Sequence, residues 1–511
     1  MNAARGNMKA VFLDRDGTLI EDRGYIASPD DVVFLPSTFL ALRKLSKNYL
    51  LFLVTQQSGV ARGILTTENV LRVNNYIERK LSDAGIHIQH SYFCPHDTED
   101  RCPCKKPSPI FLSDAAVRWG LDLAGSYVIG DHPHDVEMAK AAGAQGIYVL
   151  SGHGRKHRAE LQGDWLVAHD VGEAADWVAA LHCYGNQPAL LDEAIQKSAD
   201  AVKKGGVVVF PTETVYGVGA SAFNEKAISR IYRMKGRPAS NPLIVHAATS
   251  EKAFELTTSR NGKAELLADH FWPGPLTLIM RAHDSVPSPV RAGLPTVAVR
   301  VPGNPVARAF IQAAGCPIAA PSANPSGFLS PVSALHSVGF VHDEPDAILD
   351  GGECRFGIES TIISLIYQTP LVLRQGAIPL ETIQRLIGDV HVADPLRSTV
   401  EAPGMLRRHY APKTPLHVIP AGLPLAGYLG SVGVLTAGGR TSPDDLEVAE
   451  LTRELPGDGE MILAGLYNAL HDLDSAGLDS IAVRLMGAAA TCPVLSDRIW
   501  RASSQIKEEY R

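Results

Sequence analysis

The sequence predicts an α/β protein made of three consecutive domains. With 511 residues, the chain is long enough for about three or four ordinary domains. Short apolar runs that read as buried strands alternate with amphipathic stretches that read as helices. Polar residues directly follow many of these strands, and the ligand sites of α/β proteins lie at such strand ends. We expect domains at 1–183, 184–395 and 416–511, with a linker at 396–415.

The composition is that of a globular protein without a strong charge bias. Hydrophobic residues make up 45% and charged residues 20%, and the formal net charge is −7. This charge gives no basic footprint for tight, direct nucleic-acid binding, although it leaves a local basic patch possible. The first residues lack a hydrophobic signal core, and the longest apolar runs are far too short to cross a bilayer. We therefore expect a cytoplasmic protein that does not contact a membrane.

The N-terminal domain places acidic residues at the ends of predicted strands. The apolar run 9–13 leads into Asp14 and Asp16, which share one face of an extended segment. Two later apolar runs lead into Thr55 and into Asp131. This layout indicates a doubly wound α/β domain with its site at the carboxyl ends of the strands. Paired carboxylates suit a nucleophile with an acid/base partner, and they also attract Mg²⁺.

Cysteine and histidine residues gather on one stretch of this domain in the pattern C-x-H-x5-C-x-C. The four candidate ligands are Cys94, His96, Cys102 and Cys104. Four such ligands on one loop suit tetrahedral Zn²⁺ and leave no open position for water, which predicts a structural metal. The alternative is a set of free cysteines in a surface loop. In either case the clustering favours a reducing compartment over a disulfide framework.

The motifs DRDGT at 14–18 and GDHPHD at 130–135 resemble those of haloacid-dehalogenase-like (HAD) phosphatases, in the heptose-bisphosphate and histidinol-phosphate branch. The resemblance implies that Asp14 attacks phosphorus to form an aspartyl-phosphate, while Asp16 acts first as an acid and then as a base. It also implies a zinc loop at the place described above. The remaining implied roles are phosphate binding by Thr55, Lys105 and Lys106, Mg²⁺ binding by Asp14, Asp131 and the backbone carbonyl of Asp16, and a supporting position for Asp135.

Two departures from this branch concern the substrate. Gln56 stands where the branch usually has Asn, and Lys105 stands where the heptose enzyme has Arg. The second change removes a bidentate fork. We expect hydrolysis of a phosphorylated small metabolite whose identity the sequence leaves open.

The central domain is organised around the segment 207–246. Lys235 and Arg237 lie two residues apart on a glycine-containing segment, with Asn241 close by and His246 at the end of the next apolar run. Lys as a point charge and Arg as a fork both suit phosphate oxygens, which predicts polyanion binding. For this motif alone, a solvated basic loop that joins a helix to a strand is the ordinary interpretation.

Arg300 and Arg374 each stand at the end of an apolar strand. No acidic residue lies next to either of them in the sequence. A buried arginine needs a counter-anion, so we expect the carboxylate or phosphate of a ligand as its partner.

FPTETVYGVGA at 210–220 and KGRPASNPLIVH at 235–246 resemble the YrdC-like threonylcarbamoyl-AMP synthases. TVAVRVP, APSANPSG, GIESTII and LRQGAI follow in the order of that family, so the likeness covers roughly 190–395 and implies its twisted-sheet α/β fold. Val332 stands where many relatives have a threonine near the nucleotide. The implied ATP-binding residues are Lys235, Arg237, Asn241, Thr296, Asn324, Arg374 and Tyr410. The implied threonine-binding residues are Thr214, His246, Arg300, Ser322 and Ser360.

The implied reaction joins L-threonine, bicarbonate or CO₂, and ATP into threonylcarbamoyl-AMP, with release of pyrophosphate. Lys235, Arg237 and Mg²⁺ would catalyse it by positioning the substrates and neutralising phosphate charge. The product would pass to partner proteins that modify adenosine in tRNA. Two alternatives stay open. One is a carbamoyl-transfer enzyme of secondary metabolism, and the other is a nucleotide- or RNA-binding module beside an active phosphatase.

The last part of the chain begins with a segment that has little periodicity. Residues 396–415 are bounded by prolines, which is typical of a linker. PGMLRRHYAPKTP at 403–415 resembles the linker that folds over the active site in the longer, two-domain synthases, which implies that Tyr410 meets ATP. The alternative is a passive tether.

A small Rossmann-like α/β domain is expected after the linker. It is predicted from apolar runs at 416–419, 431–435 and 480–484 and from an amphipathic stretch at 459–474. It carries no catalytic constellation, so we expect it to cap or regulate the synthase. Asp497-Arg498 resembles the usual DR near the end of such chains, but the expected glycine-rich approach to it is missing.

Overall fold

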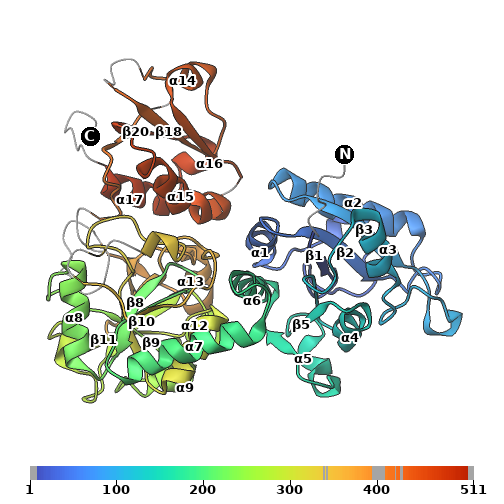
Figure 1. Cartoon of the computed structure of the whole chain (residues 1–511), viewed down its shortest axis with the longest axis horizontal. Helices are drawn as coiled ribbons and strands as arrows, with labels where there is room; N and C mark the ends of the chain where they lie inside the picture. The colour runs from blue at the N-terminus through green and yellow to red at the C-terminus, as the bar shows by residue number, and fades with distance from the viewer. Residues whose placement is uncertain are drawn as a thin grey trace. The chain divides into compact units, whose positions relative to one another are not determined.

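The computed structural model of the chain describes residues 8–337, 340, 343–393, 409–420, 422–425, 430–457 and 459–503. The chain divides into two compact units, Met1–His182 and Cys183–Arg511 (Figure 1). Most of the predicted linker at 396–415 lies outside the described residues. Among the described helices, none combines the length and the apolar composition that crossing a bilayer requires.

The first unit is built on a six-stranded parallel sheet in the order β3-β2-β1-β4-β5-β6. The central strands β1 and β4 are buried at every residue, as expected for a parallel sheet that is covered on both faces. The strands are β1 (Ala10–Leu13), β2 (Leu50–Gln56), β3 (Ile88–Cys94), β4 (Tyr127–Gly130), β5 (Gln145–Val149) and β6 (Leu166–Ala168). The helices are η1 (Pro29–Asp31), α1 (Thr38–Leu45), α2 (Thr67–Asp83), η2 (Thr98–Asp100), α3 (Ile110–Trp119), α4 (Pro133–Ala142), α5 (Gly154–His157), η3 (Arg158–Glu160) and α6 (Val171–Cys183).

The strand order of this sheet decides where its site lies. The chain winds outward from β1 through β2 to β3, and it then returns to the other side of β1 to form β4. The carboxyl ends of β1 and β4 therefore border the crevice at which doubly wound sheets bind ligands. The predicted doubly wound fold is confirmed.

The second unit contains a ten-stranded mixed sheet in the order β13-β7-β8-β12-β9-β11-β10-β14-β15-β16. The first five strands in sequence are β7 (Val208–Phe210), β8 (Gly217–Ser221), β9 (Ile244–His246), β10 (Leu276–Arg281) and β11 (Thr296–Arg300). They are followed by β12 (Ile318–Ala320), β13 (Ala347–Ile348), β14 (Thr361–Ser364), β15 (Leu371–Arg374) and β16 (His391–Val392). The helices are α7 (Pro188–Lys203), α8 (Glu225–Lys235), α9 (Ser250–Phe254), α10 (Gly262–Phe271), α11 (Ser288–Arg291), α12 (Pro305–Ala314), η4 (Leu335–Ser337) and α13 (Leu380–Ile387).

A four-stranded parallel sheet in the order β17-β20-β18-β19 follows in the same unit. Its strands are β17 (Leu416–Val418), β18 (Val432–Ala437), β19 (Leu451–Leu455) and β20 (Ser480–Leu485). Its helices are α14 (Pro443–Val448), α15 (Gly459–Asp474), α16 (Gly487–Ala490) and α17 (Pro493–Ala502). This is the small α/β domain that the sequence predicts.

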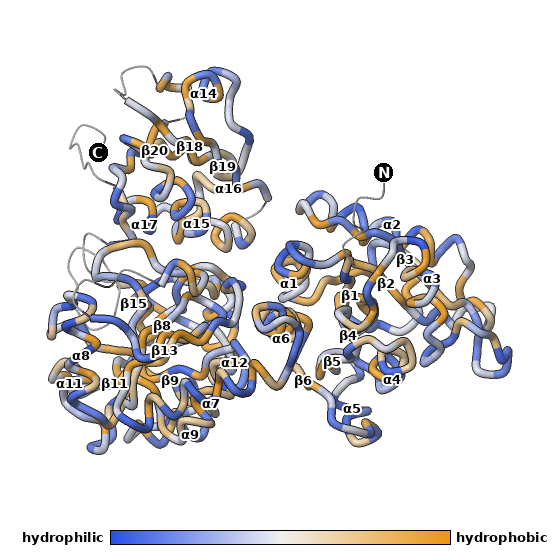
Figure 2. Tube along the Cα trace, in the orientation of Figure 1, coloured by the Kyte–Doolittle hydropathy of each residue, from blue (hydrophilic) through white to orange (hydrophobic). Residues whose placement is uncertain are grey.

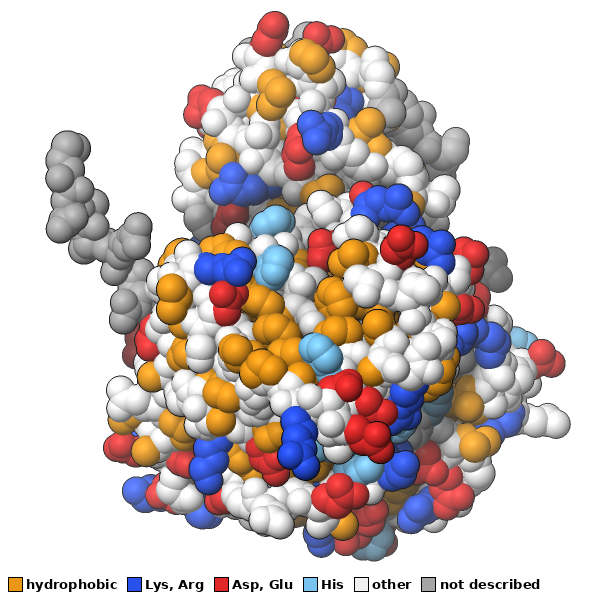
Figure 3. All heavy atoms as spheres, turned by 90° about the vertical axis from the view of Figure 1, so that its right-hand side faces the viewer, with side chains coloured by type: hydrophobic (Ala, Val, Ile, Leu, Met, Phe, Trp, Pro, Cys, Tyr) orange, Lys and Arg blue, Asp and Glu red, His pale blue; other side chains and the backbone are white. Residues whose placement is uncertain are grey.

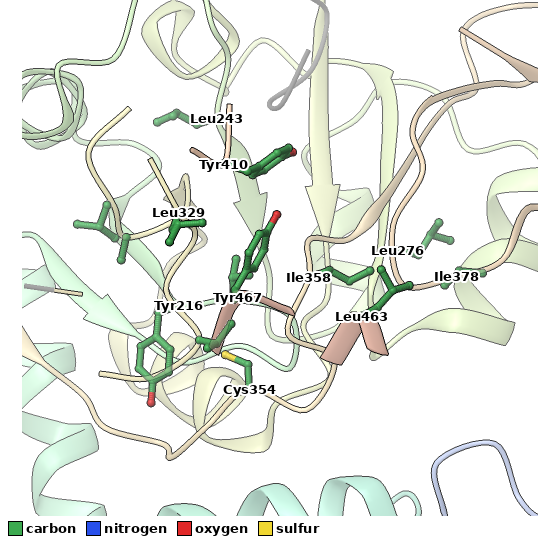
Figure 4. Close-up of a cluster of buried hydrophobic side chains, with 14 of the residues drawn as sticks. Tyr216, Leu243, Leu276, Leu329, Cys354, Ile358, Ile378, Tyr410, Leu463 and Tyr467 are labelled. Atoms are coloured by element: carbon green, nitrogen blue, oxygen red, sulfur yellow. The ribbon is translucent and has the colours of Figure 1, made fainter. Parts of the chain in front are cut away.

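One hydrophobic core runs through both sheets of the second unit. The same cluster of buried residues includes Leu276 and Ile358 from the central part and Leu463 and Tyr467 from α15 (Figure 4). The backbone of Gly357 approaches α15 so closely that a Cβ atom there would collide with the carbonyl oxygen of Ala464. The C-terminal sheet is therefore packed onto the central part by a shared apolar interface.

Hydropathy follows burial along parts of the trace: the fully buried strands β1 and β18 are apolar, and so is much of helix α6 (Figure 2). On the face shown in Figure 3, acidic and basic side chains lie interspersed, and apolar side chains gather between them. This mixture agrees with the small net charge of the chain.

Candidate active sites

The first candidate site lies at the carboxyl ends of β1 and β4. Asp14 follows β1 and Asp131 follows β4, and these two strands are parallel neighbours. The Nζ atom of Lys106 lies 2.5 Å from Oδ1 of Asp14 and 2.7 Å from Oδ1 of Asp135. One largely buried ammonium therefore joins the carboxylate that follows β1 to a carboxylate in the first turn of α4, the helix after β4.

Asp16 lies on the same loop with a separate set of partners. Its Oδ2 atom accepts hydrogen bonds from Nη2 of Arg15 and from Nε2 of Gln57, both at 2.8 Å. Thr55 Oγ1 lies 3.4 Å from the same oxygen. Asp14 and Asp16 thus have different environments, which a nucleophile and an acid/base group require.

Burial and mutual repulsion disturb the carboxylates of this site. Burial, together with the charges of Asp135 and Asp16, raises the pKa of Asp14 to about 7 despite the opposing charge of Lys106. Burial, together with the charges of Asp14 and Asp135, raises the pKa of Asp131 to about 8. The acid cluster has more negative charge than Lys106 neutralises, so its donor set fits a divalent cation.

Glycine at position 17 is required by the same crowding. Gly17 has φ +80°, and a Cβ atom there would collide with Oδ2 of Asp131. That oxygen also accepts a hydrogen bond from the backbone N–H of His153 at 2.7 Å. The loop after β1 can therefore approach Asp131 only because it carries glycine.

The cysteine–histidine loop brings its four predicted ligands together. The sulfur–sulfur distances are 3.3 to 3.7 Å, and Nδ1 of His96 lies 3.3 Å from the sulfur of Cys104 and 3.7 Å from that of Cys94. All four ligand atoms lie within 4.8 Å of one another. Zinc–sulfur bonds of 2.3 Å at tetrahedral angles separate the sulfurs by about 3.8 Å. The observed spacing is close to this value, so the four side chains fit a tetrahedral Zn²⁺.

The structure does not bring Lys105 to the first candidate site. Its Nζ atom donates a hydrogen bond to Oγ1 of Thr98 on the cysteine–histidine loop. The neighbouring side chain of Lys106 points the other way, to Asp14. Gln56, the other departure from the family pattern, donates to the carbonyl oxygen of His96 at 2.8 Å and so supports the same loop.

The second candidate site is a cavity lined by residues of β9, by the end of β11 and by the segments that follow β7 and β12. All five residues that the sequence assigns to threonine line it, and Arg237 and Arg374 of the ATP set line it as well. Its full lining is Thr212, Thr214, Val215, Tyr216, Gly217, Arg237, Ile244, His246, Arg300, Ala320, Pro321, Ser322, Glu359, Ser360, Arg374 and His409.

Strand register explains why these residues meet. β9 and β11 are parallel, and His246 is the register partner of Arg300, so the two strands end side by side. Ser322 follows β12, which runs antiparallel to β9 on its other side, so that Ala320 lies beside Ile244 and Ser322 lies beyond the start of β9. Thr296, in contrast, begins β11 while Arg300 ends it, and it is not among the lining residues.

Lys235 and Arg237 lie on either side of a helix end. α8 begins after Asn224, whose side chain accepts from the N–H of Ala227, and it ends at Gly236 in the left-handed conformation. Lys235 then donates to the carbonyl oxygens of Ser322, at 2.6 Å, and Asn324. Arg237 donates to Oδ1 of Asn241 at 2.6 Å and to the carbonyl of Pro242 at 2.7 Å. Both side chains are buried, which excludes the interpretation as a solvated loop.

Arg300 corrects one expectation, because its counter-anion belongs to the protein. Its Nη2 atom lies 2.6 Å from Oε1 of Glu213, and its Nη1 atom donates to Oγ1 of Thr214 at 3.0 Å. Glu213 comes from the segment after β7, 87 residues earlier in the chain. Sequence neighbours alone could not show this pair, because the sheet brings β7 and β11 together only on folding.

Arg374 is held by the loop before β14. Its Nε atom donates to the carbonyl of Ser360, and its Nη2 atom donates to Oγ of the same residue, both at 3.0 Å. Oγ of Ser360 also lies 2.8 Å from Oγ1 of Thr277. The threonine-assigned Ser360 and the ATP-assigned Arg374 are therefore direct neighbours.

Several buried basic side chains lie close together around the cavity. Burial and the charge of Arg237 bring the pKa of Lys235 well below its usual value. Burial lowers the pKa of Arg237 to about 10, and burial also lowers the pKa of Arg374. Burial and the charges of Arg237, Lys235 and Arg374 bring the pKa of His409 well below its usual range. This concentration of positive charge is what a bound polyphosphate would neutralise.

Several buried polar atoms around the cavity have no hydrogen-bond partner among the described residues. Leaving a buried polar group unpaired costs about 1–3 kcal/mol, so a cluster of them indicates a missing ligand. They are Nδ2 of Asn241, Nδ1 of His246, Oδ1 of Asn324, Nδ1 of His409 and Oη of Tyr410.

Tyr410, predicted from the linker motif, is completely buried next to this cavity. Its backbone is in the left-handed region, with φ 64°. Its neighbour His409 lines the cavity. The end of the linker therefore reaches the site, whereas its earlier residues lie outside the described part of the chain.

Sequence reasoning gave no role to several residues that the structure places at this site. Glu213 lies in the motif FPTETVYGVGA, Glu359 lies in GIESTII, and Arg498 belongs to the DR pair. The family motifs could therefore have identified each of them as a site residue. His409 is the neighbour of Tyr410 in the linker motif. Tyr467 lies on the apolar side of α15 and had no such signal.

Three family models match the chain. A model described as telomere recombination covers 200–376, the threonylcarbamoyl-AMP synthase C-terminal domain covers 378–504, and a HAD-hydrolase-like model covers 103–174.

The relatives fall into two groups that match different parts of the chain. The threonylcarbamoyl-AMP synthase of Pyrococcus abyssi is 39% identical over 303 residues, which is 56% of this chain and 87% of the relative. The D-glycero-beta-D-manno-heptose-1,7-bisphosphate 7-phosphatase of Yersinia pestis is 37% identical over 181 residues, which is 34% of this chain and 90% of the relative. The crystal structure of P. abyssi Sua5 complexed with L-threonine matches with a TM-score of 0.56 at 37% identity, covering 61% of this chain and 94% of that one.

Proposed function

We propose how this chain works from one premise, which is that it belongs to the threonylcarbamoyl-AMP synthase family and, in its N-terminal part, to the HAD-like heptose-bisphosphate phosphatases. It is a bifunctional enzyme that joins a threonylcarbamoyl-AMP synthase to a phosphatase. We propose functional domains at 1–183, 184–395 and 416–511, with the active-site linker at 396–415.

The synthase reaction uses L-threonine, bicarbonate or CO₂, and ATP. The observation that carries this proposal is the single cavity in which Arg300 lies near Arg237 and Arg374, ringed by unpartnered polar atoms. Arg300, held in place by Glu213, binds the threonine carboxylate, and Thr214, His246, Ser322 and Ser360 surround the rest of the amino acid. Lys235, Arg237, Asn241, Asn324, Arg374 and Tyr410 bind ATP.

Positioning and charge neutralisation supply the catalysis. Carboxylation of the threonine amine gives a carbamate, whose oxygen attacks the α-phosphate of ATP and expels pyrophosphate. Lys235 and Arg237 hold the phosphate oxygens and offset the charge that develops on them. Mg²⁺ bound with ATP would add further positive charge beside the leaving pyrophosphate. The product serves modification of adenosine in tRNA by partner proteins.

The phosphatase acts on a phosphorylated small metabolite. Asp14 attacks phosphorus and carries the phosphoryl group as an aspartyl-phosphate, while Asp16 protonates the leaving oxygen and then activates water. Lys106 and Thr55 hold the phosphoryl oxygens. Asp14, Asp131 and the backbone carbonyl of Asp16 would hold Mg²⁺, which would supply the positive charge that the acid cluster needs. The cysteine–histidine loop would hold Zn²⁺, which would fix the segment that carries Lys106.

Pyrophosphate release by the purified chain tests the synthase. With ATP present, we expect release to require both L-threonine and bicarbonate, and we expect Arg237→Ala to reduce it by at least tenfold. Release without threonine dependence would contradict the proposal. Faster turnover with carbamoyl phosphate than with bicarbonate would favour a carbamoyl-transfer enzyme, and nucleotide binding without turnover would favour a binding module. Neither alternative is favoured by the relatives that the chain matches.

A phosphatase screen tests the first unit. Asp14→Asn serves as the inactive control, because it keeps the size of the side chain and removes the nucleophile. We expect Mg²⁺-dependent release of phosphate by the unchanged chain alone. Equal activity in the Asp14→Asn chain would contradict the assigned nucleophile.

A further inference from the structure

Arg498 lies on helix α17, which belongs to the small C-terminal domain. Its side chain contacts three separate segments of the proposed synthase site. We propose that Arg498 is the positioning residue through which the C-terminal part of the chain holds the nucleotide-binding half of that site. The inference rests on the proposed synthase function and adds a residue that lies outside the central domain.

The three segments meet on one guanidinium group. Its Nε atom lies 3.0 Å from Oε2 of Glu359, and its Nη2 atom donates to the carbonyl of Gln375 at 2.8 Å. Its Nη1 atom pairs with Asp497 at 2.6 Å. The planar group also lies over the ring of Tyr410, 4.8 Å from the ring centroid. With a side chain only 1% exposed, Arg498 is fixed on every side.

Glu359, the first of these partners, also lines the cavity. Its carboxylate accepts from Oγ of Ser330 at 2.6 Å, and both of its oxygens lie 3.2 Å from the hydroxyl of Tyr467 on α15. The next residue, Ser360, accepts both hydrogen bonds from Arg374 that are described above. A displacement of Glu359 therefore moves Ser360 and, through it, Arg374.

Gln375 carries the second contact, because it follows Arg374 directly. Arg374 ends β15, and the backbone just beyond that strand is tied to α17 through the carbonyl of Gln375. Arg498 thus restrains Arg374 both through its partner Ser360 and through its own backbone.

Tyr410 carries the third contact, and its backbone is held on both sides. The N–H of His409 donates to the carbonyl of Arg501 on α17 at 3.2 Å, and the N–H of Ala411 donates to the carbonyl of Gly327 at 3.0 Å. The ring contacts Arg498 and also lies near the ring of Tyr467, with 5.9 Å between the two ring centroids. Oη of Tyr410 has no hydrogen-bond partner among the described residues, which leaves it available to a ligand.

Of the residues assigned to threonine, only Ser360 is linked to Arg498, through its neighbour Glu359, so the threonine half of the site depends less on Arg498 than the nucleotide half does. Arg300 is fixed by Glu213 and Thr214, neither of which contacts α17 in the interactions above. Loss of the guanidinium fork should therefore weaken the binding of ATP more than the binding of threonine. A purely structural role would instead lower both together.

Calorimetric titrations of Arg498→Lys with ATP plus Mg²⁺ and, separately, with L-threonine test this inference. Lysine keeps the charge but loses the fork and the planar stacking surface. We expect the Kd of ATP to rise by about tenfold or more, while the Kd of threonine stays within about twofold. Arg453→Lys is the matched control, because Arg453 pairs with Asp472 on the surface of the same sheet. We expect no change in either constant for that variant.

A second variant separates positioning from charge balance. Glu359→Gln combined with Arg498→Met removes both buried charges, so no uncompensated carboxylate is left. We expect ATP binding to stay weak in this double variant, because Tyr410 and Gln375 still lack the guanidinium. Wild-type ATP affinity in the double variant would overturn the inference, as would an unchanged ATP Kd in Arg498→Lys. If Arg498→Lys fails to fold, the double variant decides alone.

These titrations do not depend on turnover. If the unchanged chain binds ATP and threonine but releases no pyrophosphate, the proposed synthase function fails while the titrations still decide the role of Arg498.

Discussion

Lys235 is a buried amine that lies among cations and backbone carbonyls. Burial and the charge of Arg237 bring its pKa well below the usual value for lysine. A bound triphosphate would act in the opposite direction, because a nearby anion favours the charged form. The ionisation of Lys235 should therefore be linked to nucleotide binding.

We predict that the chain takes up protons when it binds ATP plus Mg²⁺. The uptake is largest at a pH between the lowered pKa of the free protein and the higher pKa of the complex. Calorimetry in buffers with different ionisation enthalpies measures it, and Lys235→Met should reduce it. Binding heats that do not depend on the buffer would contradict this prediction.

Glu213 fixes the other end of the cavity. Burial would raise its pKa, but the charge of Arg300 and the hydrogen bond from it outweigh burial, so the pKa is lowered. Glu213→Gln should leave the Arg300 guanidinium buried with less compensation. We predict a loss of about 3 kcal/mol in the free energy of unfolding of the second unit, measured by denaturant titration. Unchanged stability would mean that Arg300 finds another partner.

At the scale of elements, the strand ends were the most predictable part of both sites. Apolar runs indicated β1, β4, β7 and β9, and the polar residues that follow them do lie at the sites. The failures concern partners from distant elements. Arg300 meets Glu213 and Arg498 meets Glu359 across 87 and 139 residues. No local pattern encodes such pairs, because sheet order and helix docking create them.

Position along a strand separates two residues that the family likeness assigns to different ligands. Thr296 and Arg300 belong to the same strand, but four residues of extended chain span about 13 Å. Arg300, assigned to threonine, lines the cavity, whereas Thr296 is not among the lining residues and its assignment to ATP stays a prediction. Lys105 shows the same limit, since successive side chains next to the cysteine–histidine loop point in different directions.

The cysteine–histidine loop gives a prediction at this scale. Cys102→Ser should remove bound zinc and loosen the segment that carries Lys106, which should lower phosphatase activity by about tenfold or more. Elemental analysis and phosphate release measure the two effects. Cys183→Ser, outside the loop, should change neither of them. Full activity of a zinc-free Cys102→Ser chain would separate the loop from catalysis.

At the scale of the whole molecule, the residues proposed for each site come from one unit. Those of the proposed phosphatase lie between Asp14 and Asp135, and those proposed to contact the synthase substrates lie between Thr214 and Tyr410. We therefore predict that Asp14→Asn abolishes phosphate release and leaves threonine-dependent pyrophosphate release unchanged. Arg237→Ala should have the reverse effect. Loss of both activities in either variant would indicate that the two sites are coupled.

The whole molecule gives the small C-terminal domain a more specific role than its sequence suggested. Its sequence shows no catalytic constellation, and it was expected to cap or regulate. Its shared core with the central part and the contacts of Arg498 explain how a domain without catalytic groups of its own can shape the nucleotide site.

The central claim is that one cavity joins a triphosphate to an amino acid, and the product itself tests this most directly. The chain is incubated with ATP, L-threonine and ¹³C-labelled bicarbonate, and the nucleotides are examined by mass spectrometry. We predict threonylcarbamoyl-AMP that carries the label, together with an equal amount of pyrophosphate, and neither product when Arg300→Ala replaces the unchanged chain. Pyrophosphate without this nucleotide, or the nucleotide without the label, would contradict the account.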